Sequence, residues 1–306
     1  MSSLFAFPGQ GAQQAGMLQR LPDDAAPLLE EASDALGQSV LTLDSTEALR
    51  STRAVQLCLL LSGVAWARWL LCRSPAPDFV AGLSIGAYAA AVSADALALD
   101  DAVRLVSLRG ELMQRAYPQG YGMSALSGLD LSGVQALLAE VQGEVFIANL
   151  NGEQQIVIAG SDAGMATFVD LMHQRGQGTA KRLAVSVPSH CRLLDAPARQ
   201  LAEAFAEVNL QRPRISYLSG TTARPLFDPE RLRDDLAGNM ARVVDWRGTL
   251  RNAYERGVRL HVELPPGSVL SGLARKAWPQ GRVVALDSTR ADTVDALLRQ
   301  EVANNR

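Results

Sequence analysis

The feature that most constrains the fold is a short apolar run that ends in a serine flanked by glycines. Residues 78–83 have the composition of a buried strand, and they lead into Gly82-Leu83-Ser84-Ile85-Gly86. The residues that follow, through Ala91, are mostly small and predict a helix that begins at the serine. A strand that turns directly into a helix is typical of an α/β sheet, in which the helix carries the chain back across the sheet.

The remainder of the large region repeats this alternation. Apolar runs predict strands at residues 4–7, 215–218 and 258–264. Helical periodicity predicts helices at residues 47–71, 100–117, from 189 onward, 245–256 and 268–277. Strands that alternate with helices favour a largely parallel sheet covered on both faces.

The pattern changes after Gly122. Strands are expected at residues 123–127, 145–149, 155–159 and 179–185, and helices at 131–141 and 163–174. This βαββαβ order is the split βαβ pattern of a ferredoxin-like module. We therefore expect a small inserted subdomain at residues 124–188 and a core formed by residues 1–123 and 189–306.

Composition excludes several classes of protein. The 306 residues are 48% hydrophobic and 20% charged, and the formal net charge is −3, so neither disorder nor nucleic-acid binding is indicated. The three cysteines form no C-x-x-C pair, which argues against a disulfide framework and a zinc site. No secretory signal is recognisable, and polar residues interrupt the apolar stretch 55–71, which reads as a buried helix and not a membrane span. We expect a cytoplasmic protein.

Ser84 is the candidate nucleophile. The strand–turn–helix setting is the one that a nucleophile elbow requires, because the turn lifts the hydroxyl off the sheet and the helix N-terminus directs N–H groups at a developing oxyanion. The alternative is a simple strand-to-helix turn.

His190 is the candidate base among three histidines. His173 lies in a polar stretch, and His261 alternates with apolar residues in a predicted strand, whereas His190 lies in a loop at a strand end. Ser189 would cap the helix that follows, so that the positive helix end favours neutral imidazole. The alternative is a surface histidine.

Two further features suggest ligand contacts. Phe7-Pro8-Gly9-Gln10-Gly11 forms a glycine-flanked loop after the first strand, which lets a backbone N–H approach a ligand, although it lacks the Lys-Ser/Thr of a phosphate loop. Arg109 has mostly apolar neighbours, and a buried guanidinium needs an anionic partner. That partner is either a structural acid or a substrate carboxylate bound through two hydrogen bonds.

These features, in this order, resemble the malonyl-CoA:acyl carrier protein transacylase family. The resemblance covers residues 5 to about 277. Besides the opening loop, the elbow and the Arg109-Gly110 pair, it includes the segments Ala148-Asn149-Leu150-Asn151, Val187-Pro188-Ser189-His190-Cys191 and residues 265–273.

The resemblance implies an α/β-hydrolase-like core with a ferredoxin-like insertion. It implies that Ser84 carries the malonyl ester, that His190 acts as base and then acid, and that Arg109 holds the malonyl carboxylate. It assigns the oxyanion hole to the N–H groups of Gln10 and Ile85. It also places Gln56 near the site and implies that a backbone carbonyl at the position of Asp245 orients His190. The alternative is that the Asp245 carboxylate does so, which would make a Ser-His-Asp triad.

The implied reaction needs no metal or redox cofactor. Its partners are malonyl-CoA and an acyl carrier protein bearing a phosphopantetheine-type arm.

Two departures from fatty-acid-synthesis members point to a specialised relative. Those members usually have His before the nucleophile and Leu-Gly-Glu after it, whereas here Leu83 precedes Ser84 and Ile85-Gly86-Ala87 follows. Asp245 also stands where those members usually carry Gln or another residue before the tryptophan. The elbow and residues 54–60 are similar to the epsilon subunit of malonate decarboxylase, which charges the carrier subunit of that enzyme.

Three alternatives stay open. One is a malonyl transacylase of fatty-acid synthesis. Another is a serine esterase or thioesterase, whose chain order would select Ser84, then Asp228 or Asp245, then His261. The third is a non-catalytic scaffold that binds a carrier.

Overall fold

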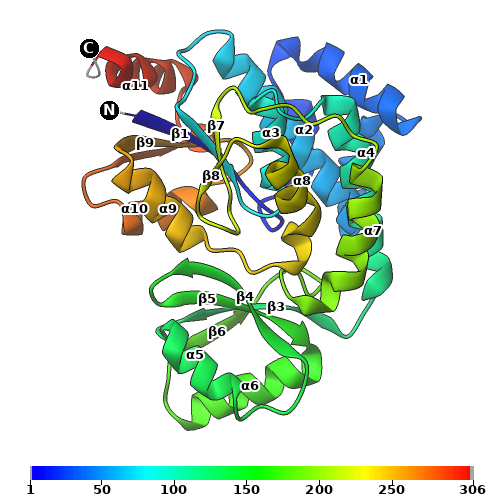
Figure 1. Cartoon of the computed structure of the whole chain (residues 1–306), viewed down its shortest axis with the longest axis vertical. Coiled ribbons are helices and arrows are strands. Elements are labelled where there is room, and N and C mark those ends of the chain that lie inside the picture. The colour runs from blue at the N-terminus through cyan, green and yellow to red at the C-terminus, as the bar shows by residue number, and fades with distance from the viewer. Residues whose placement is uncertain (1, 304–306) are drawn as a thin grey trace.

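The computed structural model describes residues 2–303, and its core is a six-stranded sheet in the order β10-β9-β1-β2-β7-β8 (Figure 1). All neighbouring strands are parallel except β8, which runs antiparallel to β7. This confirms the expected α/β core with a largely parallel sheet. The strands are β1 (Ser2–Phe7), β2 (Phe79–Gly82), β7 (Ser216–Leu218), β8 (Pro225–Leu226), β9 (Val258–Glu263) and β10 (Arg282–Ala285).

Helices cover both faces of this sheet, and β1 shows why. Phe5 and Phe7 point into one apolar cluster, while Leu4 and Ala6 point into another on the opposite face, as the two-residue period of a strand requires. The first cluster lies under most of the core helices, and the second under α9 and α10. The core helices are α1 (Ala26–Leu36), α2 (Thr52–Leu71), α3 (Gly86–Ser93), α4 (Leu99–Ala116), α7 (Asp195–Phe205), α8 (Pro229–Gly238), α9 (Trp246–Glu255), α10 (Val269–Ala277) and α11 (Ala291–Ala303).

Helix α2 is long and apolar enough to cross a membrane by length and composition alone. In this fold 78% of its apolar window is buried within the protein, and the helix packs against α3 and α4. It is the buried core helix that the sequence predicts.

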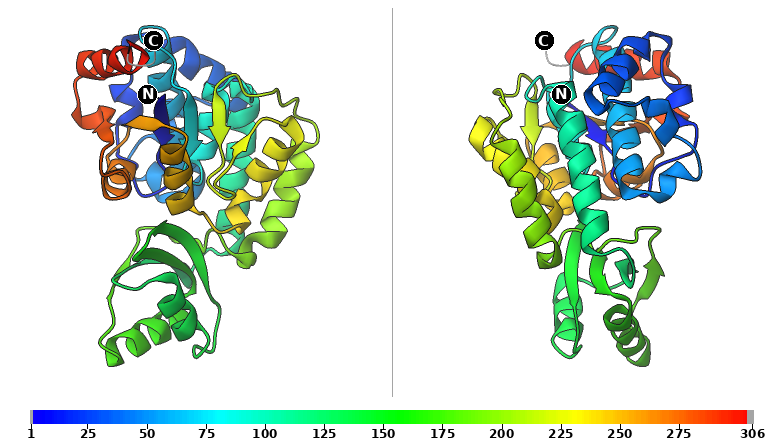
Figure 2. Two further views of the ribbon diagram at one scale, coloured as in Figure 1. Left: turned by 60° about the vertical axis from the view of Figure 1, so that its left-hand side comes forward. Right: turned by 90° about the vertical axis from the view of Figure 1, so that its right-hand side faces the viewer.

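The second sheet forms a small subdomain with the strand order β4-β5-β3-β6, all antiparallel. Its sheet faces the core, and its two helices lie on the far side (Figures 1 and 2). This is the ferredoxin-like arrangement that the sequence predicts. The elements are β3 (Tyr121–Ser127), α5 (Leu131–Leu138), β4 (Val145–Gly152), β5 (Gln155–Ser161), α6 (Asp162–Gln174) and β6 (Thr179–Arg182).

The segment after β6 differs from expectation. The helix expected from Ser189 begins only at Asp195, after a short 3₁₀ turn at Arg192–Leu194. Ser189 caps no helix, because Cys191 precedes the 3₁₀ turn and Leu194 precedes α7. His190 has a left-handed backbone with φ of 65°. The strand expected to reach residue 185 ends at Arg182. Residues 183–191 therefore form an irregular connection between the two subdomains.

Candidate active site

The turn around Ser84 is a tight elbow. Strand β2 ends at Gly82, Ser84 has φ of 56°, and α3 begins at Gly86. A Cβ on Gly82 would lie 2.0 Å from the carbonyl carbon of Gly86, and one on Gly86 would lie 2.2 Å from the carbonyl oxygen of Phe7. Only glycine fits at either position. The serine is thus held in a strained conformation at the carboxyl end of the central strands and remains partly exposed.

The loop after β1 lies directly against this elbow. A Cβ on Gly9 would meet the carbonyl oxygen of Leu83 at 2.8 Å, so glycine is what allows the contact. Within residues 2–303, the backbone N–H groups of Gln10 and Ile85 donate no hydrogen bond to a protein group. Two unpaired N–H groups beside a serine hydroxyl are suited to binding an oxyanion.

Arg109 reaches the same point from α4. It is fully buried, and it donates to Gln56 Oε1 at 2.7 Å, Asn239 Oδ1 at 3.1 Å and Ser84 Oγ at 3.2 Å. All three acceptors are neutral, and no carboxylate of residues 2–303 forms an ion pair with it. Burial lowers the pKa of Arg109, since desolvation disfavours the charged form. The site therefore contains a buried cation without a protein counter-ion, next to the serine hydroxyl.

His190 lies in the connection from the small subdomain and is 2% exposed. Its N–H donates to Met240 O at 2.7 Å, and its Nδ1 lies 2.8 Å from Asn239 O. A carbonyl only accepts, so Nδ1 carries the proton and Nε2 is left free to accept one. Burial, with Arg109 as a second cause, lowers the pKa of His190 to about 4. The imidazole is neutral at pH 7, the state a base needs, because of burial and not because of a helix N-terminus.

Comparison with known proteins identifies the family. A model of the acyl transferase domain matches residues 4–305. The malonyl CoA-acyl carrier protein transacylase of Haemophilus influenzae is 37% identical over 281 residues, covering 88% of this chain and 90% of the relative. The chain belongs to the malonyl-CoA–acyl carrier protein transacylase family. The transacylase of Bacillus subtilis (strain 168) is 32% identical, covering 92% of each chain.

Solved structures support this membership in the transacylase family. FabD from Acinetobacter baumannii superposes with a TM-score of 0.91 at 36% identity, covering 98% of this chain and 99% of that one. A malonyl-transacylase solved with its type II PKS acyl-carrier protein superposes with a TM-score of 0.90 at 33% identity, covering 96% and 99%. These matches bear the transacylase name, and they do not show a special closeness to the malonate decarboxylase epsilon subunit.

A backbone carbonyl orients His190, as the resemblance implies, but it belongs to Asn239 and not to Asp245, and the alternative of an Asp245 carboxylate on the imidazole is wrong. The Asp245 carboxylate accepts from the N–H of Gly248 at 2.8 Å and so caps the N-terminus of α9. The group that orients the imidazole of this transacylase is the backbone carbonyl of Asn239, in the 3₁₀ turn Asn239–Ala241.

Asn239 is the site residue that the sequence analysis missed. It is 3% exposed, its side chain accepts from Arg109, and its Nδ2 donates to Ser84 O at 3.3 Å. The one signal in the sequence is a lone amide among the buried apolar residues Leu236, Ala237 and Met240. A three-residue turn has no periodicity by which to place that amide.

Of the other predicted residues, one lies at the site and two have structural roles elsewhere. Gln56 lies at the site, bonded to Arg109 and, through Nε2, to Met113 Sδ at 3.3 Å. His261 is buried in β9 against the ring of Trp278, and Asp228 caps α8. The esterase triad of Ser84, an aspartate and His261 is therefore not assembled.

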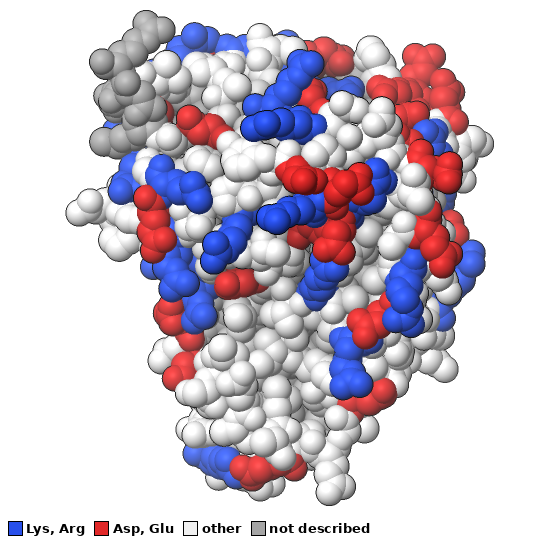
Figure 3. Space-filling model, in the orientation of Figure 1, with Lys and Arg blue, Asp and Glu red and all other residues white. Residues whose placement is uncertain are grey.

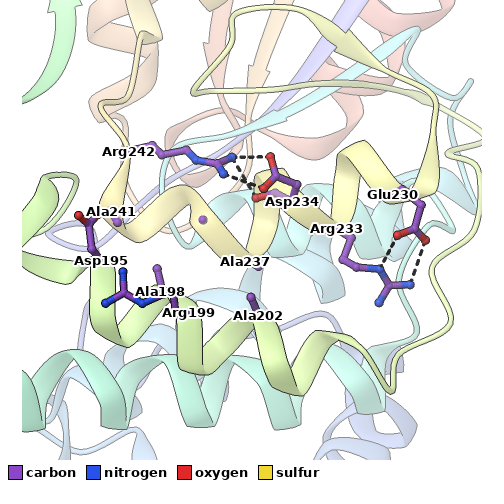
Figure 4. Close-up of a pocket in the computed structure, with 11 residues that line it drawn as sticks. Asp195, Ala198, Arg199, Ala202, Glu230, Arg233, Asp234, Ala237, Ala241 and Arg242 are labelled. Carbon is purple, nitrogen blue, oxygen red and sulfur yellow. Dashed lines mark hydrogen bonds and ion pairs between the residues drawn. The ribbon is translucent and has the colours of Figure 1, made fainter.

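One cavity adjoins the site. It has a volume of about 410 Å³, lies between the loop after β1, α2 and the segment after β6, and is lined in part by Gln10, Tyr121 and Arg182. A larger cavity of about 460 Å³ lies between α7 and α8, where the ion pairs Arg242–Asp234 and Arg233–Glu230 span its edge (Figure 4). The first cavity is lined by Gln10, one of the groups around Ser84, whereas the lining of the second cavity includes none of them.

Proposed function

We propose that this protein transfers a malonyl group from malonyl-CoA to the thiol of an acyl carrier protein through a malonyl ester on Ser84. The observation that carries the proposal is the cation of Arg109, which is fully buried, lacks an acidic partner within residues 2–303 and lies 3.2 Å from Ser84 Oγ. Leaving a charge buried and unpaired costs several kcal/mol, about the scale that a bound counter-ion recovers. The free carboxylate of a malonyl group would supply that counter-ion.

The proposed first half-reaction uses the groups gathered around Ser84. Ser84 Oγ attacks the thioester carbonyl while Nε2 of His190 takes its proton. The N–H groups of Gln10 and Ile85 bind the oxyanion of the tetrahedral intermediate. When the intermediate collapses, the carbon–sulfur bond breaks and the coenzyme A sulfur takes the proton from His190. Malonyl then remains as an ester on Ser84.

The second half-reaction reverses these steps with the thiol of the carrier. His190 removes the thiol proton, the sulfur attacks the ester, and Ser84 Oγ leaves with the proton from His190. The protons and leaving groups balance using only the enzyme, the thioester and the thiol, so the proposed cycle needs no metal or redox cofactor. The prosthetic arm belongs to the carrier.

The acyl carrier protein is the better-supported partner. The relatives described above are named for transfer to such carriers, and one was solved with a type II PKS carrier. They favour a biosynthetic transacylase over the malonate decarboxylase role expected from the sequence. The malonate decarboxylase role stays a candidate because of the elbow, in which Leu83 and Ala87 flank the Ser84 turn.

Parallel turnover measurements with a fatty-acid carrier and a malonate decarboxylase carrier separate these two roles. A strong preference for the fatty-acid carrier assigns the protein to biosynthesis, and the reverse preference assigns it to the decarboxylase.

We place the reaction in the cytoplasm. The protein carries three unpaired cysteine thiols, two of them buried, which suits a reducing compartment. On the face shown in Figure 3, basic and acidic side chains are interspersed, so this face has no extended basic surface of the kind that binds nucleic acid.

Mass spectrometry after incubation with malonyl-CoA tests the proposal. The wild type should gain one malonyl group on Ser84, and Ser84→Ala should gain none while remaining folded. Ser93→Ala is a matched control, because it removes a buried hydroxyl at the other end of α3 that has no hydrogen-bond partner within residues 2–303. Rapid hydrolysis without a carrier would indicate a thioesterase. Absence of an adduct on the wild type would indicate a scaffold.

A further inference from the structure

Asn239 contacts all three groups of the site. Its backbone carbonyl accepts from His190 Nδ1 at 2.8 Å. Its side-chain oxygen accepts from Arg109 at 3.1 Å, and its side-chain nitrogen donates to the carbonyl of Ser84 at 3.3 Å. The amide therefore links the cation to the strained backbone of the serine, while the backbone carbonyl serves the histidine independently of the side chain.

The neutrality of this amide has a chemical consequence. A buried guanidinium is usually held by a carboxylate, which satisfies its hydrogen bonds and neutralises its charge together. Here Gln56 and Asn239 supply oxygen acceptors without a negative charge. Moreover, Arg109 Nε is buried and has no hydrogen-bond partner within residues 2–303. The guanidinium is thus fixed in position but keeps its charge and an unused donor at Nε.

We infer that the side chain of Asn239 is a specificity-determining positioning residue, which holds Arg109 toward Ser84 without neutralising it and so selects acyl groups that bear a carboxylate. The inference rests on the proposed function and assigns part of its substrate choice to one amide. The amide acts through Arg109, and the substrate carboxylate replaces Ser84 Oγ as the partner of that arginine.

Asparagine and aspartate have nearly the same shape but differ in charge. Comparing Asn239→Asp with Asn239→Ala therefore separates the effect of charge on substrate choice from the effect of lost packing. If Asn239 only fills space, Asn239→Asp should be milder than Asn239→Ala, which leaves a cavity. If its neutrality matters, aspartate should be the more harmful change for malonyl, because the new carboxylate pairs with Arg109 and competes with the substrate. Transfer of an acyl group without a carboxylate should be largely insensitive to that pairing.

The experiment measures acylation of Ser84 from malonyl-CoA and from acetyl-CoA, by rapid quench and mass spectrometry at pH 8. For Asn239→Asp we expect kcat/KM with acetyl-CoA to fall by less than about tenfold, because aspartate lacks the Nδ2 donor to Ser84 O whichever substrate reacts. We expect kcat/KM with malonyl-CoA to fall at least about 30-fold further, mainly through KM. For Asn239→Ala we expect a smaller loss with malonyl-CoA. Asn252→Asp is the matched control, since Asn252 also accepts from an arginine, Arg256, but on the outer part of α9, and it should change neither rate.

Two results would overturn the inference. One is an unchanged ratio of malonyl to acetyl acylation in Asn239→Asp, and the other is a malonyl loss in Asn239→Ala at least as large as in Asn239→Asp. Melting temperatures of both variants show whether a loss reflects unfolding, and the ratio between the two substrates is unaffected by the fraction folded. Failure of the proposed function is distinct, because it would show as a wild type that forms no malonyl-Ser84.

Discussion

Replacing Arg109 with methionine should separate malonyl from acetyl transfer. Methionine keeps much of the length of the side chain and removes its charge. Because Arg109 is fully buried and its partners are neutral, the bound carboxylate would be its only close counter-ion within the described site. Removing one member of a buried charge pair costs about 2–5 kcal/mol, or roughly 30-fold to several thousand-fold in kcat/KM. Acetyl-CoA lacks the carboxylate and should lose less than about tenfold.

The same change should leave the protein folded. It leaves the acceptors Gln56 Oε1 and Asn239 Oδ1 without a donor, which destabilises the fold by about 1–3 kcal/mol each. It also removes a buried cation, whose desolvation destabilises the wild type by several kcal/mol. These terms oppose each other, so we expect a net change within about 2 kcal/mol, seen as a shift of a few degrees in melting temperature.

The assay for Arg109→Met is single-turnover acylation of Ser84 with each thioester, followed by mass spectrometry. Equal losses with malonyl-CoA and acetyl-CoA in a folded variant would refute the reasoning and make Arg109 a structural residue.

Three further predictions follow from the same contacts. Asp245→Asn should lose less than about tenfold in turnover, because asparagine also caps helices and a carbonyl orients His190; a loss near 10⁴, as in a true triad, would contradict this. Because the pKa of His190 is lowered to about 4, its base form persists as pH falls, so kcat/KM for malonyl acylation should stay level from pH 8 to about 5; a limb near 6.5 would show that the imidazole is not desolvated. Burial lowers the pKa of His261 to about 3. As pH falls below about 6.5, His261 therefore becomes protonated in the unfolded chain but not in the folded one, and its contribution to the free energy of unfolding declines by about 1.4 kcal/mol per pH unit. Urea midpoints at pH 7 and 5 should therefore converge in His261→Phe relative to the wild type, and an unchanged difference would contradict this.

The parts of the fold that the sequence predicted are those governed by local sterics. The elbow is specified by Gly82 and Gly86, because any side chain there would collide with backbone about 2 Å away. The small subdomain was recognised because its helices and strands follow one another at regular short spacing. Strands β8 and β10 and helices α1, α8 and α11 were missed. Strands β8 and β10 are only two and four residues long, too short for a periodic pattern to register.

The candidate site was predicted only in part, for a physical reason. Ser84, Arg109 and His190 carry distinctive side chains, so residue type alone makes them candidates. The group that orients His190 is a backbone carbonyl, which every residue possesses, and its placement depends on how the turn after α8 packs. The resemblance implied a backbone carbonyl but located it at Asp245, whose carboxylate instead caps α9.

The unpaired charge of Arg109 affects both the substrate and His190. The sequence suggested that a helix N-terminus would lower its pKa, but His190 precedes the helix and has no such contact. Burial and the positive charge of Arg109 lower it instead. An Arg109 neutralised by a protein carboxylate would not attract a substrate carboxylate, and it would no longer add to the lowering of the His190 pKa that burial causes. Bound malonyl would partly cancel that charge, so the basicity of His190 should rise when the correct acyl group enters, at the point where a stronger base is needed to accept the Ser84 proton.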